Sequence, residues 1–458
     1  MGDRTKKARS DDAANWEISP NGYFRIAKSD GVFWLADPAG NRFLSKGVNT
    51  VRYDQDAIRN SSRAPYAEAC RHKYGTIERW RATVADRLAG WGFNTLGAWS
   101  DEAVATAGSA ILGVTPNLDL GMSYTWDAKV SAANIPRQEF PDVFDPNFED
   151  HIRRRAQALC APRTRERHII GWFIDNELRW GPDWRGPDEL LMLFINLPTT
   201  LPGRHAALAW LRHRHGDFEQ FNSIFRTPCR SWDELAALAH VEPPYCRKPS
   251  YQRTMSEESY ANHVDPRRAA FAADCNAFAA LIAERYFALT SSAIRAVDPN
   301  HLVLGSRFAY APACDIVDAA ARHADVISFN CYDTDPSAAI RACAASGKPC
   351  LIGEFSFRGC DSGLPNTNGA GPIVPTQADR AAGFRRYVTA ALRHPSIIGY
   401  HWFEHADQPA EGRFDGENSN FGTVTINDDI YDELTRTITS VNAEADAVHA
   451  DAALSYVV

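Results

Sequence analysis

Short, almost continuously apolar segments recur along the chain, and longer amphipathic segments separate them. Continuous apolar runs are typical of parallel strands covered on both faces, whereas half-exposed strands alternate apolar and polar positions. Eight of the apolar segments have the length of a strand, and they end near Asn49, Trp99, Leu118, Glu177, Arg307, Tyr332, Phe355 and Phe403. The pattern therefore predicts a parallel β-sheet buried between helices.

The segments between these strands have helical spacing. Residues 77–92, IERWRATVADRLAGWG, repeat apolar positions at intervals of three and four and stop at two glycines. Residues 148–160 and 266–299 also read as amphipathic helices. Eight strands with helical crossovers predict an α/β fold of the (β/α)8 type, a TIM barrel, whose functional side chains lie at the C-terminal ends of the strands.

The flanks of this pattern predict further parts. Residues 1–15 are strongly polar and are expected to be disordered, and residues 16–42 are expected to form a β-hairpin cap. The catalytic barrel is expected to span residues 43–440, with a long helical insertion after strand four at about residues 184–265. Residues 441–458 are expected to form a C-terminal tail.

Composition narrows the possible partners. The 458 residues are 45% hydrophobic and can bury a large core, and the formal net charge is -8. An acidic excess argues against nucleic acid or an anionic membrane surface as a partner. The polar N-terminal stretch has no apolar run that could serve as a signal peptide or membrane span, so we expect a cytoplasmic protein. The oligomeric state stays open.

Ten cysteines are scattered along the chain, and no two form a CxxC pair. This spacing matches no zinc or iron–sulfur signature. We expect most of them to be buried thiols in a reducing compartment, without a disulfide framework.

Two carboxylates stand out among the strand-end residues. The fourth apolar segment, GWFIDNE, ends in Asp175, Asn176 and Glu177, and the seventh, IGEFSF, contains Glu354. Cleavage of a glycosidic bond uses such a pair, because one carboxyl protonates the leaving oxygen while the other attacks or activates water. The sequence therefore predicts a glycosidase site that needs no cofactor and no metal.

Further strand-end side chains are predicted to bind the substrate. Asn176 can hydrogen-bond a sugar hydroxyl beside Glu177, and Tyr332 can hydrogen-bond the second carboxylate. The other candidates are Asn49, Trp99, Arg307, Asn330, Trp402 and Glu404. A purely structural role is the alternative for each, as a turn residue, a satisfied buried polar group or a packed core side chain.

The segment HWFEH, from His401 to His405, fits the H-x-x-E-H motif of inverted zinc peptidases. That chemistry needs both histidines on one face of a helix, but this segment continues an apolar strand and reaches Pro409 four residues later. Glu404 is better interpreted as a substrate-subsite residue or as structural.

Two loops after the last strands are expected to shape the site. Residues 358–380 are rich in Gly, Pro and Asn and follow the strand of Glu354, so a pocket wall or lid is favoured over a plain surface loop. Residues 405–422 offer further groups for binding hydroxyls, namely Asp407, Gln408, Arg413, Glu417 and Asn418.

An Asn-Glu pair ending strand four, a Glu on strand seven and a Trp ending strand eight together resemble the clan A glycoside hydrolases, which are retaining enzymes on this barrel. Within them, GWFIDNELRWG, IGEFSF and YVTAALRHPSIIGYHWFEHADQP resemble the family 50 β-agarases. Residues 206–238 resemble a segment of the family 42 β-galactosidases. The resemblance implies that Glu177 is the acid/base, Glu354 the nucleophile and Trp402 a sugar-stacking platform.

Together these features predict a retaining β-glycosidase with an exo action on β-linked oligosaccharides. The resemblance implies a galactose-containing substrate. Two alternatives stay open, a transglycosylase of the same clan and a catalytically silent sugar-binding barrel.

Overall fold

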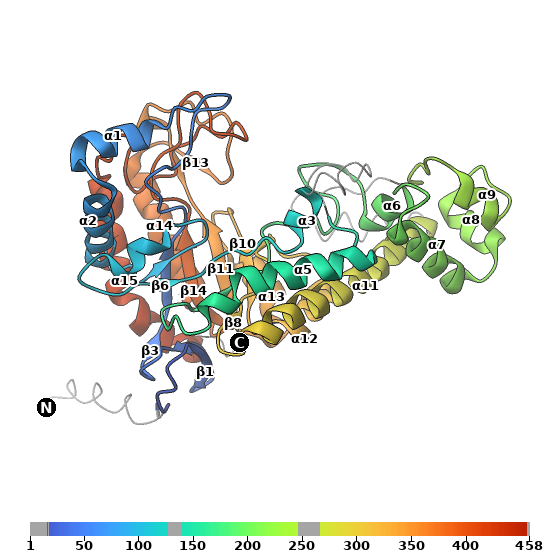
Figure 1. Cartoon of the computed structure of the whole chain (residues 1–458), viewed down its shortest axis with the longest axis horizontal. Helices are drawn as coiled ribbons and strands as arrows, with labels where there is room; N and C mark the ends of the chain where they lie inside the picture. The colour runs from blue at the N-terminus through green and yellow to red at the C-terminus, as the bar shows by residue number, and fades with distance from the viewer. Residues whose placement is uncertain (1–15, 17, 127–139, 246–265, 456–458) are drawn as a thin grey trace, which may run out of the picture.

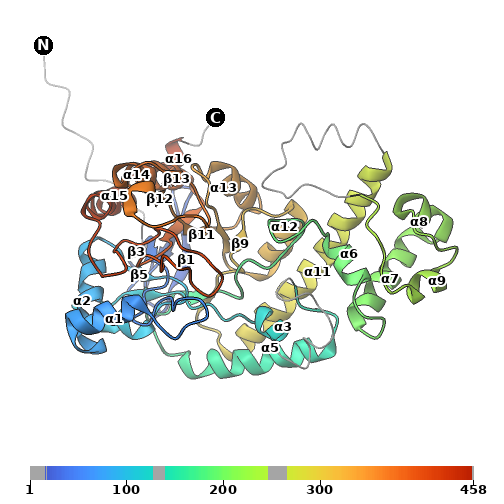
Figure 2. The same ribbon diagram turned by 90° about the horizontal axis from the view of Figure 1, so that it is seen from above.

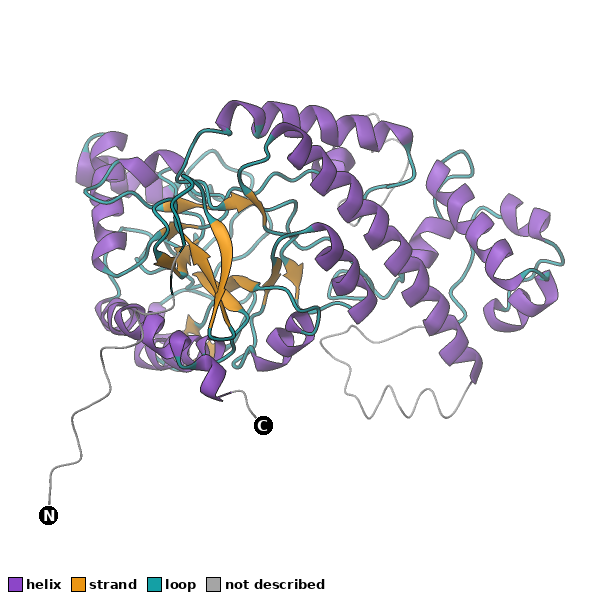
Figure 3. Ribbon diagram, turned by 90° about the horizontal axis from the view of Figure 1, so that it is seen from below, coloured by secondary structure: helices purple, strands orange, loops and turns teal. Residues whose placement is uncertain are grey.

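A parallel β-sheet surrounded by helices forms the centre of the protein in the computed structural model, which describes residues 16, 18–126, 140–245 and 266–455 (Figures 1 and 3). Seven strands pair in the order β6-β5-β4-β14-β11-β10-β9, and all neighbours are parallel. Their bounds are β4 Ser45–Val48, β5 Thr95–Leu96, β6 Gly113–Val114, β9 Phe308–Ala309, β10 Ile327–Asn330, β11 Cys350–Phe355 and β14 Ile397–Trp402. The predicted α/β fold is confirmed.

A second parallel sheet pairs β7 (Gly171–Trp172) with β8 (Leu302–Val303). Isolated parallel bridges, Val114 to Ile169 and Asn117 to Phe173, connect the residues around β6 with those around β7. The strands of the expected barrel therefore lie, within the described residues, in two open sheets and not in the single closed sheet expected from the sequence. The ladder breaks after β8 because the backbone leaves the extended conformation at Gly305 (φ 82°) and Arg307 (φ 47°).

The N-terminal strands β1 (Arg25–Ser29), β2 (Val32–Ala36) and β3 (Arg42–Phe43) form a small antiparallel sheet, as the hairpin prediction required. Asp30 and Gly31 turn the chain with positive φ at both positions, the geometry of a two-residue hairpin loop. Phe24 and Leu35 from this sheet pack on a cluster of buried apolar side chains that lie mostly at the starts of the parallel strands: Ile170, Phe173, Leu304, Val326, Leu351 and Ile398. The hairpin thus seals the sheet at the end opposite the strand C-termini.

Helices cover the outside of the sheets. Their bounds are α1 Pro65–Tyr74, α2 Ile77–Gly90, α3 Met122–Trp126, α5 Pro146–Leu159, α11 Pro266–Val297, α12 Cys314–His323, α13 Ser337–Ala344, α14 Gln377–Leu392, α15 Asp432–Ala450 and α16 Ala452–Ser455. Short 3-10 turns and one further strand pair complete the chain: η1 Glu102–Thr106, η2 Ala161–Arg163, η4 Cys360–Ser362, β12 Arg358–Gly359 and β13 Ile373–Val374. Residues 441–450, expected as a tail, are the second half of α15, whose buried face packs against α14. The expected disorder of residues 1–15 lies outside the described residues.

Four helices after strand β7 form a group apart from the sheets, beside the N-terminal half of the long helix α11 (Figures 1 and 2). They are α6 Leu190–Ile195, α7 Pro202–His215, α8 Phe218–Phe225 and α9 Trp232–Ala237. Phe225 packs edge-on against Phe271 of α11, and buried Asp274 on the same helix pairs with Arg214 and His215 of α7. The sequence predicted a helical insertion in this part of the chain.

A buried ion-pair network ties α1 and α2 to the segment after β14. The Asp428 carboxylate accepts from the Arg87 guanidinium at 2.7 Å and from Lys73 Nζ at 2.9 Å. Tyr66 Oη donates to it at 3.0 Å. The hydrogen bonds and positive charge of Arg87 hold the pKa of Asp428 well below its usual range, although burial alone would raise it.

The nine described cysteines are free thiols, and seven of them are buried, as expected. Over the ranges that the structure describes, no helix combines the length and the apolar character that crossing a membrane would require.

Candidate functional site

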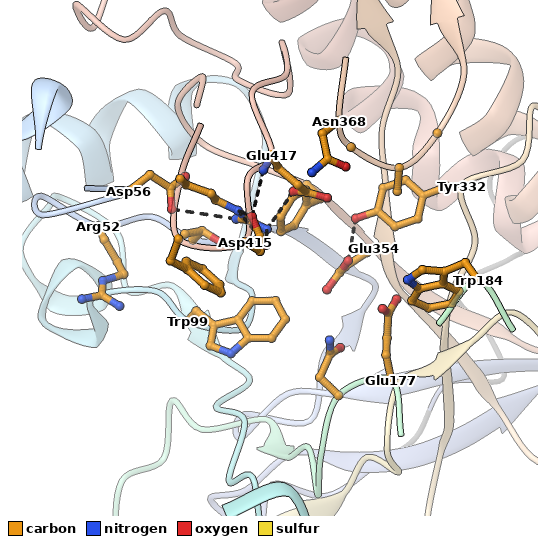
Figure 4. Close-up of a pocket in the computed structure, with 18 of the residues that line it drawn as sticks. Arg52, Asp56, Trp99, Glu177, Trp184, Tyr332, Glu354, Asn368, Asp415 and Glu417 are labelled. Atoms are coloured by element: carbon orange, nitrogen blue, oxygen red, sulfur yellow. Dashed lines mark hydrogen bonds and ion pairs between the residues drawn. The ribbon is translucent and has the colours of Figure 1, made fainter. Parts of the chain in front are cut away.

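A cavity of about 710 Å³ opens at the C-terminal ends of the parallel strands (Figure 4). It is lined by strand-end residues and by the loops that follow them: Thr50, Arg52, Asp56, Trp99, Asn176, Glu177, Trp184, Tyr310, Tyr332, Glu354, Asn368, Gly369, Ala370, Gly371, Phe403, Arg413, Phe414, Asp415 and Glu417. Glu177 and Glu354, predicted as a pair, lie together in it. Asn176, Tyr332 and Trp99, which the sequence predicts to bind the substrate, also line it.

Glu354 near the end of β11 is held by two donors. Tyr332 Oη donates to Glu354 Oε2 at 2.5 Å, and an Arg307 Nη donates to Oε1. Glu354 as a whole is 4% exposed, so its carboxylate depends on these partners for hydrogen bonds and not on bulk water. The arrangement fixes both oxygens of the carboxylate and leaves it facing the cavity.

The two donors are themselves held in place. Burial, followed by the negative charge of Glu354, raises the pKa of Tyr332 well above its usual range, so its hydroxyl stays protonated and donates. Arg307 is fully buried, its Nε donates to Asn176 Oδ1 at 2.8 Å, and its guanidinium lies 4.9 Å from the centre of the Trp99 ring. Arg307 thus connects the residue beside Glu177 to Glu354.

Glu177 has a different environment. Asn330 Nδ2 donates to its Oε1 at 2.9 Å and to Asn176 Oδ1 at 3.1 Å. Burial, followed by the negative charge of Glu354, raises the pKa of Glu177 to about 7. The two carboxyl groups therefore have different surroundings. Glu177 retains a proton near neutral pH, whereas Glu354 is bound to the Arg307 guanidinium.

Close packing under this pair requires a glycine. A Cβ on Gly353 would lie 2.7 Å from Asn330 Oδ1 and 3.2 Å from Arg307 Nη1. Any larger residue would displace the donors that contact Glu177 and Glu354.

Several residues at the strand ends hold a left-handed backbone. The φ angles are 60° at Trp99, 51° at Glu177 and 47° at Arg307, and Thr50 and Tyr310 are also positive. For residues with a Cβ this conformation costs about 1 kcal/mol or more each. All five lie in or against the cavity, so backbone strain is concentrated at the site.

An acidic group lies at the far side of the cavity from Trp184 (Figure 4). Arg413 pairs with Glu417 at 2.8 Å and with Asp415 at 3.0 Å, and it lies 3.8 Å from both Asp56 and Glu404. Burial raises the pKa values of Asp56, Glu404 and Glu417. Asp56, Asp415 and Glu417 line the cavity, so this wall presents carboxyl groups that can accept hydrogen bonds from hydroxyls or, when protonated, donate to them.

Trp402 does not line the cavity, so the prediction that it is a sugar-stacking platform is wrong. The side chain is fully buried, Nε1 donates to the Phe421 carbonyl at 2.9 Å, and the ring packs against Phe355 and Phe384. Successive side chains of a strand point to opposite faces. The next residue, Phe403, is the one that faces the cavity.

Four other predicted site residues lie behind the cavity wall. Asn49 is buried and donates to the Trp402 carbonyl at 3.2 Å and to the Gly353 carbonyl at 2.9 Å, so it ties the end of β4 to β14 and β11 and does not line the cavity. Glu404 is buried and accepts from Gln408 Nε2 at 2.9 Å. Asn330 and Arg307 are buried too, but they contact the carboxyl pair directly.

The loops supply residues that sequence reasoning did not single out, namely Thr50, Arg52, Asp56, Trp184, Tyr310, Phe403, Phe414 and Asp415. A signal for Trp184 and Phe414 was nevertheless present in the sequence, since each is an aromatic residue inside a turn rich in Gly, Asp or Pro, where packing gives no reason for one. The predicted pocket wall after strand seven is present as Asn368 to Gly371, and Arg413 and Glu417 come from the predicted loop after strand eight.

The H-x-x-E-H motif does not assemble a metal site. His401 Nε2 lies 2.8 Å from Ser45 Oγ and His405 Nε2 lies 3.2 Å from Tyr66 Oη, so the two rings have separate partners. Burial lowers the pKa of each to about 3. In the described part of the chain no three His, Cys, Asp or Glu residues are grouped as metal ligands would be.

Two curated proteins resemble this chain over most of its length. β-Agarase A of Vibrio sp. (strain JT0107) is 28% identical over 91% of this chain and 45% of its own length. β-Agarase B of the same organism is 25% identical over 93% of this chain and 49% of its own length. The chain spans about half the length of these relatives. No protein-family model matches it.

Solved structures share the fold. An exo-β-agarase matches with a TM-score of 0.76 and 23% identity, over 94% of this chain and 66% of that one. The crystal structure of another agarase matches with a TM-score of 0.71 and 23% identity over the same shares of the two chains. The chain is thus a homologue of β-agarases that has their fold.

Proposed function

We propose that this protein is a retaining glycoside hydrolase that cleaves β-linked saccharides containing galactose. The observation that carries the proposal is the carboxyl pair in one cavity, with Glu354 bound by Arg307 and Tyr332 and with the pKa of Glu177 raised to about 7. A nucleophile must be ionised and an acid must hold a proton at the same pH. The two environments meet these opposite requirements.

In the first step, an oxygen of Glu354 attacks the anomeric carbon and Glu177 gives its proton to the departing glycosidic oxygen. The product is a glycosyl ester on Glu354. In the second step, the Glu177 carboxylate takes a proton from water, whose oxygen attacks the same carbon and releases Glu354. Tyr332 and Arg307 hold the attacking carboxylate in place in both steps.

The substrate assignment rests on the relatives, which are β-agarases. Aromatic side chains and planar polar groups line the cavity, the mixture that binds sugars through their C–H faces and hydroxyls. We propose agarose-derived oligosaccharides as the first substrates and an exo action, which the exo-β-agarase of the same fold supports.

We also propose that the two sheets together form an irregular (β/α)8 barrel of the clan A type. Support comes from the bridges between the residues around β6 and β7, and from β9, which follows β8 and pairs with β10. The proposed kinship of residues 206–238 with the family 42 β-galactosidases rests on their sequence alone.

The experiment compares the wild type with Glu354→Ala on agarose-derived oligosaccharides and aryl β-galactosides at equal protein concentration. We expect the variant to lose cleavage and added azide to restore it, with an α-configured glycosyl azide as the product. This result would support Glu354 as the nucleophile. NMR of the first wild-type product then gives the anomeric outcome, which is β for a retaining enzyme. Undiminished cleavage by Glu354→Ala, or an α product from the wild type, overturns the proposal.

A further inference from the structure

Trp184 is an exposed aromatic residue placed inside the cavity. Its side chain is 53% exposed, yet it lines the same cavity as Glu177 and Glu354. Figure 4 shows the ring beside Glu177, across the site from Trp99 and Arg52. A large indole left in water has no stabilising role in the core, and in a cavity wall it offers a flat apolar face to a ligand.

The loop that presents Trp184, residues 181–188, is braced at both ends. Buried Arg179 donates from Nε to the Gly181 carbonyl at 3.2 Å and from Nη2 to the Asp188 carbonyl at 3.1 Å. A Cβ on Gly186 would lie 3.0 Å from Arg179 Nη2, so the loop packs directly on this guanidinium. Asp183 and Gly186 exchange backbone hydrogen bonds of 3.1 and 3.2 Å across the turn.

Arg185 connects this loop to the proposed acid/base. Its Nη1 donates to the Glu177 carbonyl at 2.7 Å, and its Nε donates to Asp183 Oδ2 at 2.9 Å. The guanidinium also lies 4.6 Å from the centre of the Trp184 ring. The indole is therefore held in a fixed relation to the peptide of Glu177, which limits the ordering cost of binding a ligand on it.

We propose that Trp184 is the platform for the leaving-group sugar. The inference rests on the proposed function, in which Glu177 protonates the oxygen that departs with that sugar. The leaving group must therefore lie on the Glu177 side of the site, and Trp184 is the aromatic side chain tethered there. Trp99, against Arg307 and across the site, faces the sugar that becomes bound to Glu354.

The same platform serves the second step. After the leaving group departs, an acceptor sugar can occupy its place on Trp184 and compete with water for the glycosyl ester. Its hydroxyl oxygen then attacks the anomeric carbon while the proton goes to Glu177, and Glu354 is released. Trp184 thus sets the partition between hydrolysis and sugar transfer.

The test compares Trp184→Ala with the wild type. Trp126→Ala is the matched control, because Trp126 is 52% exposed and lies outside the cavity lining. With agarose-derived oligosaccharides, we expect kcat/KM of Trp184→Ala to fall about tenfold, the size of one lost aromatic contact. In excess acceptor oligosaccharide with added methanol, we expect the ratio of sugar-transfer product to methyl glycoside to fall about as much. Methanol needs no platform and serves as the internal reference.

Three outcomes overturn the inference. An unchanged kcat/KM in Trp184→Ala removes the platform role. A lowered kcat/KM with an unchanged product ratio places the platform under the glycosyl part of the substrate instead. An equal loss in Trp126→Ala makes the effect nonspecific. Failure of the proposed function is distinguishable, because the wild type would then cleave none of these oligosaccharides.

Discussion

The hydroxyl of Tyr332 lies 2.5 Å from Oε2 of Glu354, and both residues line the cavity although each is almost completely buried. Tyr332 lies just after the end of β10, and Glu354 lies in β11. Strand pairing between β10 and β11 therefore sets the position of the proposed nucleophile, since Asn330 and Glu354 are register partners.

Tyr332→Phe removes the donor and leaves the ring. We expect kcat/KM to fall about 10²-fold, because a charge-stabilising donor is lost at the reacting carboxylate. Tyr387→Phe is the control, since it removes a hydroxyl bonded to the Cys331 carbonyl at 2.6 Å and away from the cavity. The control should lower Tm without changing turnover per folded molecule. Similar kinetic losses in both variants would contradict a specific role for Tyr332.

Glu177 should titrate near neutral pH and respond to its neighbour. Burial and the charge of Glu354 raise its pKa to about 7, so we expect activity to fall as pH rises above that value. In Glu354→Gln the neighbouring charge is absent, and the pKa of Glu177 should move down toward its ordinary range. Carboxyl 13C NMR of the labelled wild type and labelled Glu354→Gln measures the pKa of Glu177 in each. Labelled Glu177→Gln identifies the resonance that belongs to Glu177. An unchanged pKa would mean that burial alone sets it.

The raised pKa of Glu177 also predicts a stability effect. A carboxyl whose folded pKa is above its ordinary 4.5 binds more protons in the folded state, so its contribution to stability falls as pH rises from about 4.5 to about 7. Glu177→Gln carries no charge at any pH. We expect the free energy of unfolding of this variant to exceed that of the wild type by about 1–3 kcal/mol at pH 8 and by little at pH 4. Urea unfolding at the two pH values measures the difference, and a pH-independent gap would contradict the linkage.

The contribution of Asp428 to stability should depend on pH in the opposite direction to that of Glu177. Its folded pKa is held below its ordinary 3.8, so its ionised form stabilises the fold above that pH and loses this effect as pH falls through the folded value. Asp428→Asn leaves Arg87 and Lys73 without a buried counter-charge, and we expect a loss of about 3 kcal/mol at pH 7. The difference in stability between the wild type and Asp428→Asn should be smaller at pH 3. Tm at the two pH values tests this, with the exposed-pair variant Asp54→Asn as control.

Trp402→Phe separates core packing from sugar binding. Because Trp402 is fully buried and bonds the Phe421 carbonyl, we expect a lower Tm and an unchanged KM for oligosaccharides. A raised KM with an unchanged Tm would restore the platform role that the buried position contradicts.

The sequence predicted the strands and the carboxyl pair because both leave local marks. Continuous apolar runs identify covered parallel strands, and polar residues that end such runs, as at Glu177, mark strand C-termini. It failed at Trp402 because the run HWFEH does not tell which of two neighbouring aromatic residues faces inward. It also could not place Trp184, whose position depends on Arg179 and Arg185 folding a loop against the site.

The left-handed backbone at Thr50, Trp99, Glu177, Arg307 and Tyr310 sets a limit on how this protein can be made more robust. Asparagine or glycine at these positions would relax the main chain, which is an easy route to a higher Tm. Yet each such change removes or re-aims a side chain in or against the cavity. Substitutions meant to raise Tm are therefore best made in the helices on the outside of the sheets. A stabilising change there does not alter the side chains of the cavity and should leave catalytic turnover unchanged.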